Sequence, residues 1–277
     1  MVKQLIDQAV VLVDQALPYA QAFRGATFVI KYGGKAMITD TLKQSVTRDI
    51  ALLKAFGINP VVVHGGGPEI TRRMEKARLK PTFVNGLRVT NAATIRIVRD
   101  VFLEINNEIA DRLRGHDTKS QRVAGCLTAK QKNADLGMVG TLTRVDKKKI
   151  RAVLDRGAVP VISPIATDGK RSYNINADTA ATEIAIALRA RKLTILSDVD
   201  GVLEDGALVS HLSIAIARRH IKRGVITGGM IPKVEACIRA VEAGVPKAHL
   251  INGTIAHSLL FEIFTDTGVG TEIVSRR

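Results

Sequence analysis

TFVIKYGGK, at residues 27–35, joins a short apolar run to a glycine pair flanked by two lysines. PVVVHGGG at residues 60–67 has the same layout, and similar apolar runs occupy residues 159–164, 193–198 and 248–252. Buried parallel strands are short, rich in β-branched residues and bounded by Gly, Pro or Asn. The five runs, beginning with residues 27–32 and 60–64, therefore predict strands of a sheet that is buried on both faces.

Amphipathic stretches separate these strands, and each has the periodicity of a helix. They lie at residues 41–56, 68–76, 92–113, 148–156, 178–190, 213–223, 231–243 and 257–264. Strand–helix alternation with short connections predicts an α/β fold, a three-layer αβα sandwich around a mainly parallel sheet. No linker interrupts the chain, so we expect a single domain over residues 1–277, with a weak composition shift at residues 166–170 between two lobes.

An additional helix is expected ahead of the first strand. Residues 2–19 carry an apolar stripe at helical spacing, and Pro18 should break or kink this helix. The strand–helix core does not require the stripe. Two interpretations are therefore open, since the helix either packs on its own domain or contacts another subunit.

Composition places the chain among folded proteins. Apolar residues make up 46% and charged residues 24% of the sequence, and no apolar run reaches the roughly 20 residues that cross a bilayer. The start has no signal-peptide layout, so we expect a cytoplasmic protein. Cys126 and Cys237 form no metal-ligand cluster, so we expect buried free thiols and no bound metal.

The net charge of +15 suits anionic partners such as nucleotides and acidic metabolites. Nucleic acid is the obvious rival. It is disfavoured because the chain has only three Tyr, seven Phe and no Trp to stack on bases, and because its basic residues are spread along the sequence.

Three glycine-rich segments point to an anion site. KYGGK at residues 31–35 and HGGG at residues 64–67 follow expected strands, and GGM at residues 228–230 opens the helix that carries Lys233. Glycines at helix starts let backbone N–H groups approach a phosphate or carboxylate, and ligands bind at the carboxyl edge of an open α/β sheet. The P-loop and the dinucleotide fingerprint are both missing.

Single polar residues are more ambiguous. His64 has no second ligand or acid–base partner at a suitable spacing, which favours a structural role. Arg88 fits either a bidentate contact with a carboxylate or a solvated surface charge. Asp178 fits either a helix N-cap or a site carboxylate, and Asp198 could cap a helix, turn the chain or orient a lysine.

Seven segments together resemble the N-acetyl-L-glutamate kinases, a group within the amino-acid kinase family. The resemblance runs from about residue 2 to 275, and its strongest segments are VIKYGGKAM, VVVHGGGPEI, NGLRVT, NINADTAATEIA, LSDVDGVL, GGMIPKVEACIRA and HSLLFEIFTDTGVGT. It implies the amino-acid kinase fold. It also implies ATP-dependent phosphorylation of the γ-carboxylate of N-acetyl-L-glutamate to N-acetyl-L-glutamyl 5-phosphate, the second step of arginine biosynthesis.

The same resemblance implies roles for individual residues. By position in the family motifs, the matches to the catalytic set are Lys31 and Lys233, which stabilise the transferring phosphoryl group, and Asp178, which organises them. The matches to the substrate site are Gly66, Gly67, Asn174 and Arg88, with Arg88 on a substrate carboxylate. The matches to the nucleotide site are Gly33, Gly34 and Asp198, with Asp198 orienting Lys233.

ATP with Mg²⁺ is the implied co-substrate, and no tightly bound cofactor is expected. A carboxylate nucleophile is already ionised near neutral pH, so the reaction needs no general base. The task is to bring two anions together and to stabilise charge on the transferring group, which suits lysines and glycine N–H groups.

The resemblance also divides the chain and implies regulation. Residues 1–24 match the helical extension of arginine-inhibited members, about 25–170 the acetylglutamate-binding lobe, and about 171–277 the nucleotide-binding lobe. In such members the extension joins dimers into a hexamer, a trimer of dimers, and L-arginine binds beside it. The matching pocket residues are Tyr19, Lys192, Glu262 and Gly268.

Relatives in photosynthetic lineages bind a PII signalling protein, so a PII protein is one partner that the resemblance allows. Neither nucleic acid nor a membrane is expected as a partner.

One segment departs from the family pattern. After residues 123–125 a GLSGKDG-like stretch is usual, whereas residues 126–130 here run almost directly on to residues 134–137, so that the hairpin is shortened.

Two alternative functions stay open: a kinase for a related acidic substrate such as carrier-bound aminoadipate, and a non-catalytic anion-binding regulator. Retention of Lys31, Asp178 and Lys233 together argues against the regulator.

Overall fold

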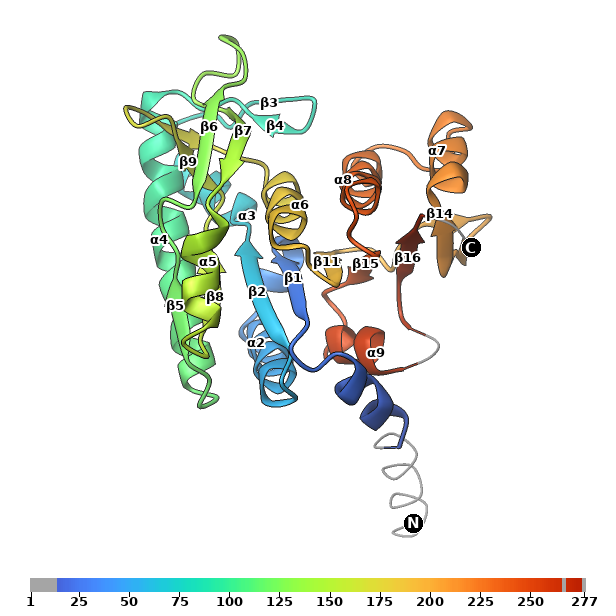
Figure 1. Ribbon diagram of the computed structural model, residues 1–277. Coiled ribbons are helices and arrows are strands. Elements are labelled where there is room, and N and C mark those ends of the chain that lie inside the picture. Colours follow the sequence, from blue (N-terminus) through green and yellow to red (C-terminus); the bar gives the residue numbers. More distant parts are fainter. Residues whose placement is uncertain (1–13, 266–267, 276–277) are drawn as a thin grey trace.

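The computed structural model describes residues 14–265 and 268–275 and is built around an eight-stranded sheet (Figure 1). The strand order is β14-β16-β15-β11-β1-β2-β8-β5. The five predicted strands form its contiguous middle, as β15 (Lys247–Asn252), β11 (Lys192–Ser197), β1 (Thr27–Tyr32), β2 (Asn59–His64) and β8 (Val159–Ile162). All neighbouring pairs among these five are parallel, which confirms the prediction of a mainly parallel sheet.

The outer strands of the sheet were not predicted from the sequence. They are β5 (Ser120–Arg122) at one edge, and β16 (Thr271–Val274) and β14 (His211–Ser213) at the other. β16 runs antiparallel to β15, and β14 runs parallel to β16. These strands are short and partly exposed, so no continuous apolar run marks them in the sequence.

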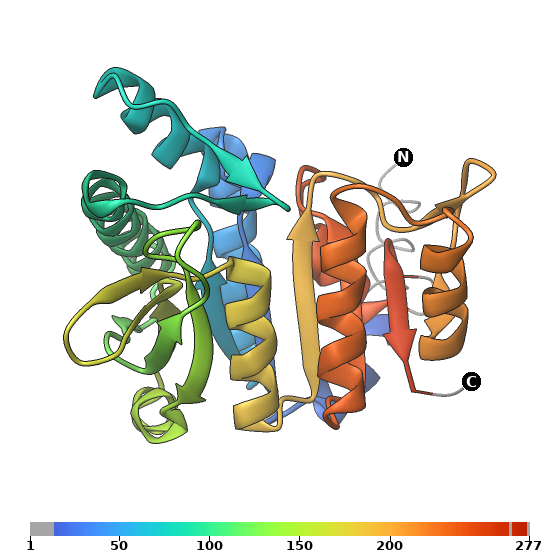
Figure 2. The ribbon, with the colours of Figure 1, turned by 90° about the horizontal axis from the view of Figure 1, so that it is seen from above.

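Two layers of helices enclose the sheet, which confirms the predicted sandwich (Figures 1 and 2). One layer contains α2 (Asp40–Ala55), α3 (Gly67–Lys76), α4 (Ala92–Arg114) and α9 (Ser258–Phe264). The other contains α5 (Lys147–Leu154), α6 (Ala177–Leu188), α7 (Ile214–Lys222) and α8 (Met230–Glu242). Each of these helices lies within two residues of its predicted bounds.

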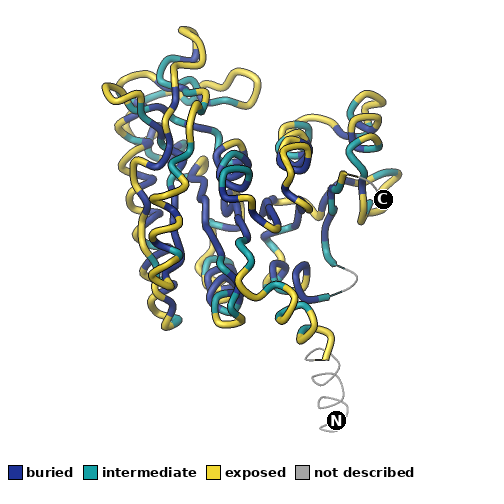
Figure 3. The backbone as a smooth tube through the Cα atoms, in the orientation of Figure 1, coloured by how far each residue is buried: buried dark blue, intermediate teal, exposed yellow. Residues whose placement is uncertain are grey.

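Alternation of side chains along β1 decides where its lysine points. Phe28 and Ile30 belong to the core beneath the first helix layer, and Val29 belongs to the core beneath the second. Successive strand residues face opposite sides of a sheet. Lys31 therefore shares the side of Val29, which is the side of α6 and α8. Buried residues are concentrated in these central strands (Figure 3).

A smaller sheet and two hairpins project from the carboxyl edge of the main sheet. The small sheet has the order β10-β9-β6-β7 and contains β6 (Leu127–Gln131), β7 (Gly140–Val145), β9 (Ile165–Thr167) and β10 (Ser172–Asn174). The hairpins are β3 (Phe83–Val84) with β4 (Leu87–Arg88), and β12 (Leu203–Glu204) with β13 (Ala207–Leu208). β6 and β7 pair along their length, so the segment that is shorter than the family pattern still forms a hairpin.

Only part of the expected N-terminal helix falls within the described residues, because residues 2–13 lie outside them. Residues 14–22 are helical through Pro18, so of the expected break or kink the break is wrong, and the kink stays a prediction. A proline removes only its own N–H group, and the next turn keeps its bonds: the Phe23 amide donates to the Tyr19 carbonyl at 2.9 Å. The Phe23 ring packs edge-on against Phe28 of β1, so this helix contacts its own domain.

Two further expectations concern the described part of the chain as a whole. Within residues 14–265 and 268–275, no helix is both long enough and apolar enough to cross a membrane. Cys126 and Cys237 are buried free thiols, as predicted.

Candidate active site

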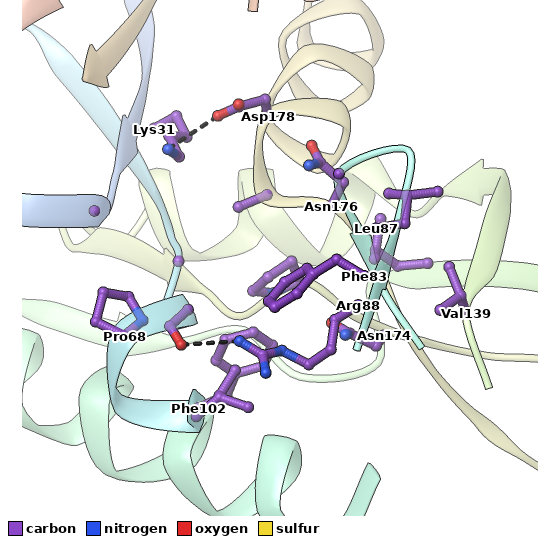
Figure 4. Close-up of a pocket in the computed structure, with 18 of the residues that line it drawn as sticks. Lys31, Pro68, Phe83, Leu87, Arg88, Phe102, Val139, Asn174, Asn176 and Asp178 are labelled. Atoms are coloured by element: carbon purple, nitrogen blue, oxygen red, sulfur yellow. Dashed lines mark hydrogen bonds and ion pairs between the residues drawn. The ribbon is translucent and has the colours of Figure 1, made fainter. Parts of the chain in front are cut away.

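The carboxyl ends of β1 and β2 meet the first turns of α3, α6 and α8 at one edge of the sheet. A cavity of about 290 Å³ opens there (Figure 4). The predicted residues that line it are Lys31, Gly34, Gly67, Arg88, Asn174, Asp178 and Lys233. The fold thus brings Lys31 and Lys233, which are 202 positions apart in the sequence, into one site.

Asp178 joins the two lysines of the predicted catalytic set. Its Oδ1 atom lies 3.0 Å from Nζ of Lys31 in an ion pair, and its Oδ2 atom accepts a hydrogen bond from Nζ of Lys233 at 3.1 Å. All three side chains are largely buried, with exposed fractions of 9% for Lys31, 10% for Asp178 and 21% for Lys233. Two cations and one anion therefore share the wall of the cavity, which leaves a net positive charge facing it.

Burial and charge act in opposite directions on this cluster. Burial lowers the pKa of Lys31, and the charge of Asp178 counteracts that effect. Burial alone would raise the pKa of Asp178, but the two ammonium groups outweigh it and hold the pKa below its usual value. Asp178 is therefore ionised, and its charge favours the protonated form of the buried lysine.

Asp178 does not cap its helix, which decides between the two interpretations of this residue. The N-cap of α6 is Asn176, whose side chain accepts from the Thr179 amide at 3.0 Å. Asn176 also lines the cavity and was not predicted, although it lies in the quoted segment NINADTAATEIA. Because Asn176 caps the helix, the carboxylate of Asp178 is available for the lysines.

Gly66 permits close packing at the start of α3. A Cβ atom at this position would lie 2.9 Å from both Ile105 and Phe102 of α4, which is closer than such atoms can approach. The next residue, Gly67, begins α3 and lines the cavity. The first N–H groups of a helix have no intrahelical partner and attract anions, so this helix start suits a carboxylate or phosphate.

The Arg88 guanidinium is buried and held by several groups rather than solvated. Its Nη2 donates to the Gly67 carbonyl at 3.0 Å and to Oγ1 of Thr71 at 2.8 Å. Nη1 contacts Sδ of Met74 at 3.3 Å, and the guanidinium carbon lies 4.6 Å from the centre of the Phe83 ring. The surface-charge interpretation of Arg88 is therefore wrong, and Thr71 and Phe83 are supporting residues that the sequence did not reveal.

Asp198 lies beside the glycine loop rather than in direct contact with Lys233. Its Oδ2 atom forms an ion pair with Nζ of Lys35 at 3.3 Å, and Lys35 directly follows the Gly33–Gly34 pair. Burial raises the pKa of Asp198, while the charges of Lys35 and, more weakly, Lys233 bring it below its usual value. The expected role in orienting Lys233 stays a prediction.

His64 has the structural role that the sequence favoured. It is fully buried, its Nδ1 lies 2.9 Å from the Gly65 carbonyl, and its Nε2 lies 3.0 Å from Oγ of Ser163. Burial lowers the pKa of His64 to about 4, so the ring is neutral at physiological pH. The neutral ring ties the end of β2 to the segment that follows β8.

A second cavity, of about 320 Å³, lies at the amino ends of β11 and β15, away from the first. Its lining includes all four predicted pocket residues, Tyr19, Lys192, Glu262 and Gly268. Glu262 pairs with Nδ1 of His249 and accepts from the Val269 amide at 2.8 Å. Burial lowers the pKa of Lys192 to about 8, against the opposing charge of Glu262. The cavity therefore combines a buried cation, Lys192, with a buried carboxylate, Glu262.

Comparison with known proteins identifies the family to which this fold belongs. The model of the amino acid kinase family matches residues 26–252. The chain belongs to the amino acid kinase family. Acetylglutamate kinase of Desulforamulus reducens is 46% identical over 284 residues, covering 98% of each chain. Acetylglutamate kinase of Thermosynechococcus vestitus is 48% identical and covers 95% of this chain and 93% of its own.

A solved structure of another protein shares this amino acid kinase fold. N-acetylglutamate synthase from Neisseria gonorrhoeae, complexed with coenzyme A and N-acetyl-glutamate, matches with a TM-score of 0.88 at 26% identity, over 97% of this chain and 64% of the synthase. The same synthase complexed with coenzyme A and L-arginine matches with a TM-score of 0.84 at 25% identity. The amino acid kinase fold that the sequence predicted is thus confirmed.

Proposed function

We propose that this chain transfers the γ-phosphoryl group of ATP to the γ-carboxylate of N-acetyl-L-glutamate, giving N-acetyl-L-glutamyl 5-phosphate and ADP. This reaction is the second step of arginine biosynthesis. Support comes from the relatives named acetylglutamate kinase, which are 44–48% identical over nearly the whole chain. Mg²⁺ enters with ATP as part of the co-substrate.

The arrangement of charge around the first cavity carries the proposal. Lys31 and Asp178 lie on one side of it and Arg88 lies on the other (Figure 4). A substrate with two carboxylates fits this layout, because Arg88 can hold one while the other reaches the lysines. Arg88 can form a bidentate pair with a carboxylate once the substrate displaces one of the present Nη2 contacts, and such a pair fixes orientation as well as position.

The lysines supply the electrostatic part of the mechanism. As the carboxylate oxygen attacks the γ-phosphorus atom, negative charge spreads over the phosphoryl oxygens and grows on the leaving ADP. Lys31 and Lys233 on either side of the transferring group stabilise that charge, and Asp178 holds the two ammonium groups in place beforehand. Gly33 and Gly34 face the phosphates, and residues after about 171, including Asp198, form the nucleotide-binding lobe.

An assay of product chemistry tests the proposed reaction. ADP formation should require N-acetyl-L-glutamate, and added hydroxylamine should trap the acyl phosphate as a hydroxamate. Carrier-bound aminoadipate should not replace the substrate. Faster turnover with the longer acid would assign the chain to that substrate, and no turnover with either acid would favour the non-catalytic regulator.

Arg88→Lys is expected to raise the KM for N-acetyl-L-glutamate by about 10-fold or more, because a point charge cannot reproduce a bidentate fork and charged hydrogen bonds contribute about 1.5–3 kcal/mol. The kcat and the KM for ATP should change much less. Arg72→Lys is the matched control, since Arg72 is an exposed arginine that pairs with Glu69 on α3. An unchanged KM in the Arg88 variant would remove this residue from the substrate site.

We further propose that L-arginine inhibits the enzyme by binding in the second cavity. Glu262 offers a carboxylate to the guanidinium group, and Lys192 offers an ammonium group to the α-carboxylate. At Gly268 a Cβ atom would lie 2.9 Å from Oε2 of Glu262, so this glycine permits the close approach of the loop to the carboxylate. Tyr19, which belongs to the N-terminal extension at residues 1–24, lies in the wall of the same cavity.

We also propose that this extension joins dimers into a hexamer. Light scattering can measure the mass of the assembly and so test this proposal.

Glu262→Gln is expected to raise the arginine concentration needed for half inhibition by about 10-fold or more, because the neutral amide loses a charged hydrogen bond worth about 1.5–3 kcal/mol. Turnover without arginine is measured in parallel. Glu242→Gln serves as the control, since Glu242 pairs with Arg218 on the surface. Equal arginine sensitivity in the two variants would contradict a role for Glu262 in inhibitor binding.

A further inference from the structure

The loop between β6 and β7 lies between the two segments that carry Arg88 and Asn174. The Leu136 carbonyl accepts from the Thr90 amide at 3.0 Å, and the Met138 amide donates to the Thr90 carbonyl at 2.6 Å. On its other side, the Met138 carbonyl accepts from the Asn174 amide at 2.9 Å. The loop therefore joins the segment after β4 to β10 through backbone hydrogen bonds, and neither segment carries its site residue independently.

The Thr90 side chain makes the same connection at its hydroxyl group. Thr90 is completely buried. Its Oγ1 donates to the Arg88 carbonyl at 2.7 Å and accepts from Nδ2 of the Asn174 carboxamide at 3.3 Å. One hydroxyl thus has both its donor and its acceptor capacity used, once by each of the two residues that line the cavity.

Gly137 shows how closely the loop approaches Thr90. Its φ is +66°, and a Cβ atom there would lie 2.5 Å from the Thr90 carbonyl oxygen. Both the left-handed backbone and the missing space restrict this position to glycine. The loop is therefore pressed against the Thr90 backbone, and the buried hydroxyl has a fixed place.

We propose that Thr90 is a positioning residue for the acetylglutamate site. Its hydroxyl fixes the orientation of the Asn174 carboxamide and ties that carboxamide to the strand that carries Arg88. Arg88 and Asn174 lie side by side in the cavity wall (Figure 4), so the two groups reach the substrate as one preformed unit. This inference rests on the proposed function, because it assigns Thr90 to the binding of that substrate.

Removal of the hydroxyl should affect one substrate only. In Thr90→Val, Nδ2 of Asn174 loses the acceptor of a part-buried hydrogen bond, so the carboxamide is no longer held in one orientation. We expect the KM for N-acetyl-L-glutamate to rise about 10-fold, the equivalent of roughly 1.4 kcal/mol, since a hydrogen bond typically contributes about 0.5–1.5 kcal/mol. The kcat and the KM for ATP should stay within about twofold of the wild-type values. Thr90→Ser keeps the hydroxyl and should restore the KM.

A double-mutant cycle separates positioning from general destabilisation. If Thr90 acts through Asn174, then Thr90→Val should raise the KM little further in an Asn174→Ala background. Thr90→Ala removes the same hydroxyl without adding a methyl group beside Asn174, and it replaces the valine variant if that variant does not fold. Thermal unfolding of every variant is measured alongside.

The outcomes distinguish this inference from the proposed function. If the wild-type chain does not phosphorylate N-acetyl-L-glutamate, the proposed function fails. If the wild type is active but the hydroxyl-free variants keep the wild-type KM, the positioning role is overturned. It is also overturned if Thr90→Ser behaves like Thr90→Val, or if the effects of Thr90 and Asn174 on the KM simply add.

Discussion

Lys233→Ala should lower kcat by about 10²–10³-fold while the KM for N-acetyl-L-glutamate stays near its wild-type value. Nζ of Lys233 lies 3.1 Å from Asp178 at the cavity wall, and in the proposed mechanism it stabilises charge that develops only as the phosphoryl group moves. An interaction made in the transition state but not with bound substrate changes kcat rather than KM. Loss of one such group costs about 2.7–4 kcal/mol in comparable sites.

Steady-state kinetics of the purified variant check this result. Lys222→Ala is the matched control, since Lys222 is an exposed lysine in the last turn of α7. The control should retain wild-type turnover. If Lys233→Ala turns over as fast as the control, or if only its KM changes, Lys233 has no part in stabilising the transition state.

Asp178→Asn should have an effect of similar size on kcat, together with a change in the pH profile. The neutral amide keeps the shape of the side chain but removes the charge that supports the proton on Lys31. Burial already lowers the pKa of Lys31, and the charge of Asp178 opposes that effect. Without this charge the pKa falls further. Activity of the variant should therefore decline at a lower pH on the alkaline side than activity of the wild type.

The variant is compared with Glu183→Asn, which removes a carboxylate of the same helix that pairs with the exposed Arg239. We expect a large loss of kcat for Asp178→Asn only, of about 10²-fold or more by analogy with the loss of one charge-stabilising group. In the double variant with Lys233→Ala the losses should not add, because Asp178 acts through the lysines. An unchanged alkaline limb in Asp178→Asn would show that this carboxylate does not control the protonation of Lys31.

The central strands of the sheet could be predicted because local sequence patterns mark where they begin and end. β1, β2 and β11 are short, mainly apolar and almost entirely buried strands, and each is followed by a turn that glycine or aspartate marks clearly. β5 and β14 have no such run, since their stability comes from pairing with neighbours distant in the sequence. Edge strands of this kind are visible only once the sheet is assembled.

The candidate site likewise contains residues that the sequence predicts and residues that only the folded structure reveals. Lys31, Asp178 and Lys233 were accessible from the sequence because they sit in motifs with a known resemblance, and the fold brings them together. The hydroxyl of Thr90 and the cap of Asn176 depend on which atoms approach each other across the fold, at 3.3 Å and 3.0 Å respectively. Pro18 does not break its helix as one alternative expected, because its own missing N–H does not prevent the next helical turn.

Strand β11 runs from the second cavity to the active-site edge of the sheet. Lys192, its first residue, lines the second cavity, and Asp198 directly follows its last residue at the active-site edge. All six residues of the strand are buried, and close-packed interiors leave such a strand little freedom to bend or slide alone. In mechanical terms β11 is a stiff element about 20 Å long, at roughly 3.3 Å per residue. Because β11 pairs with β1 and β15, a displacement at one end of the strand would be shared with these neighbours rather than absorbed by local bending.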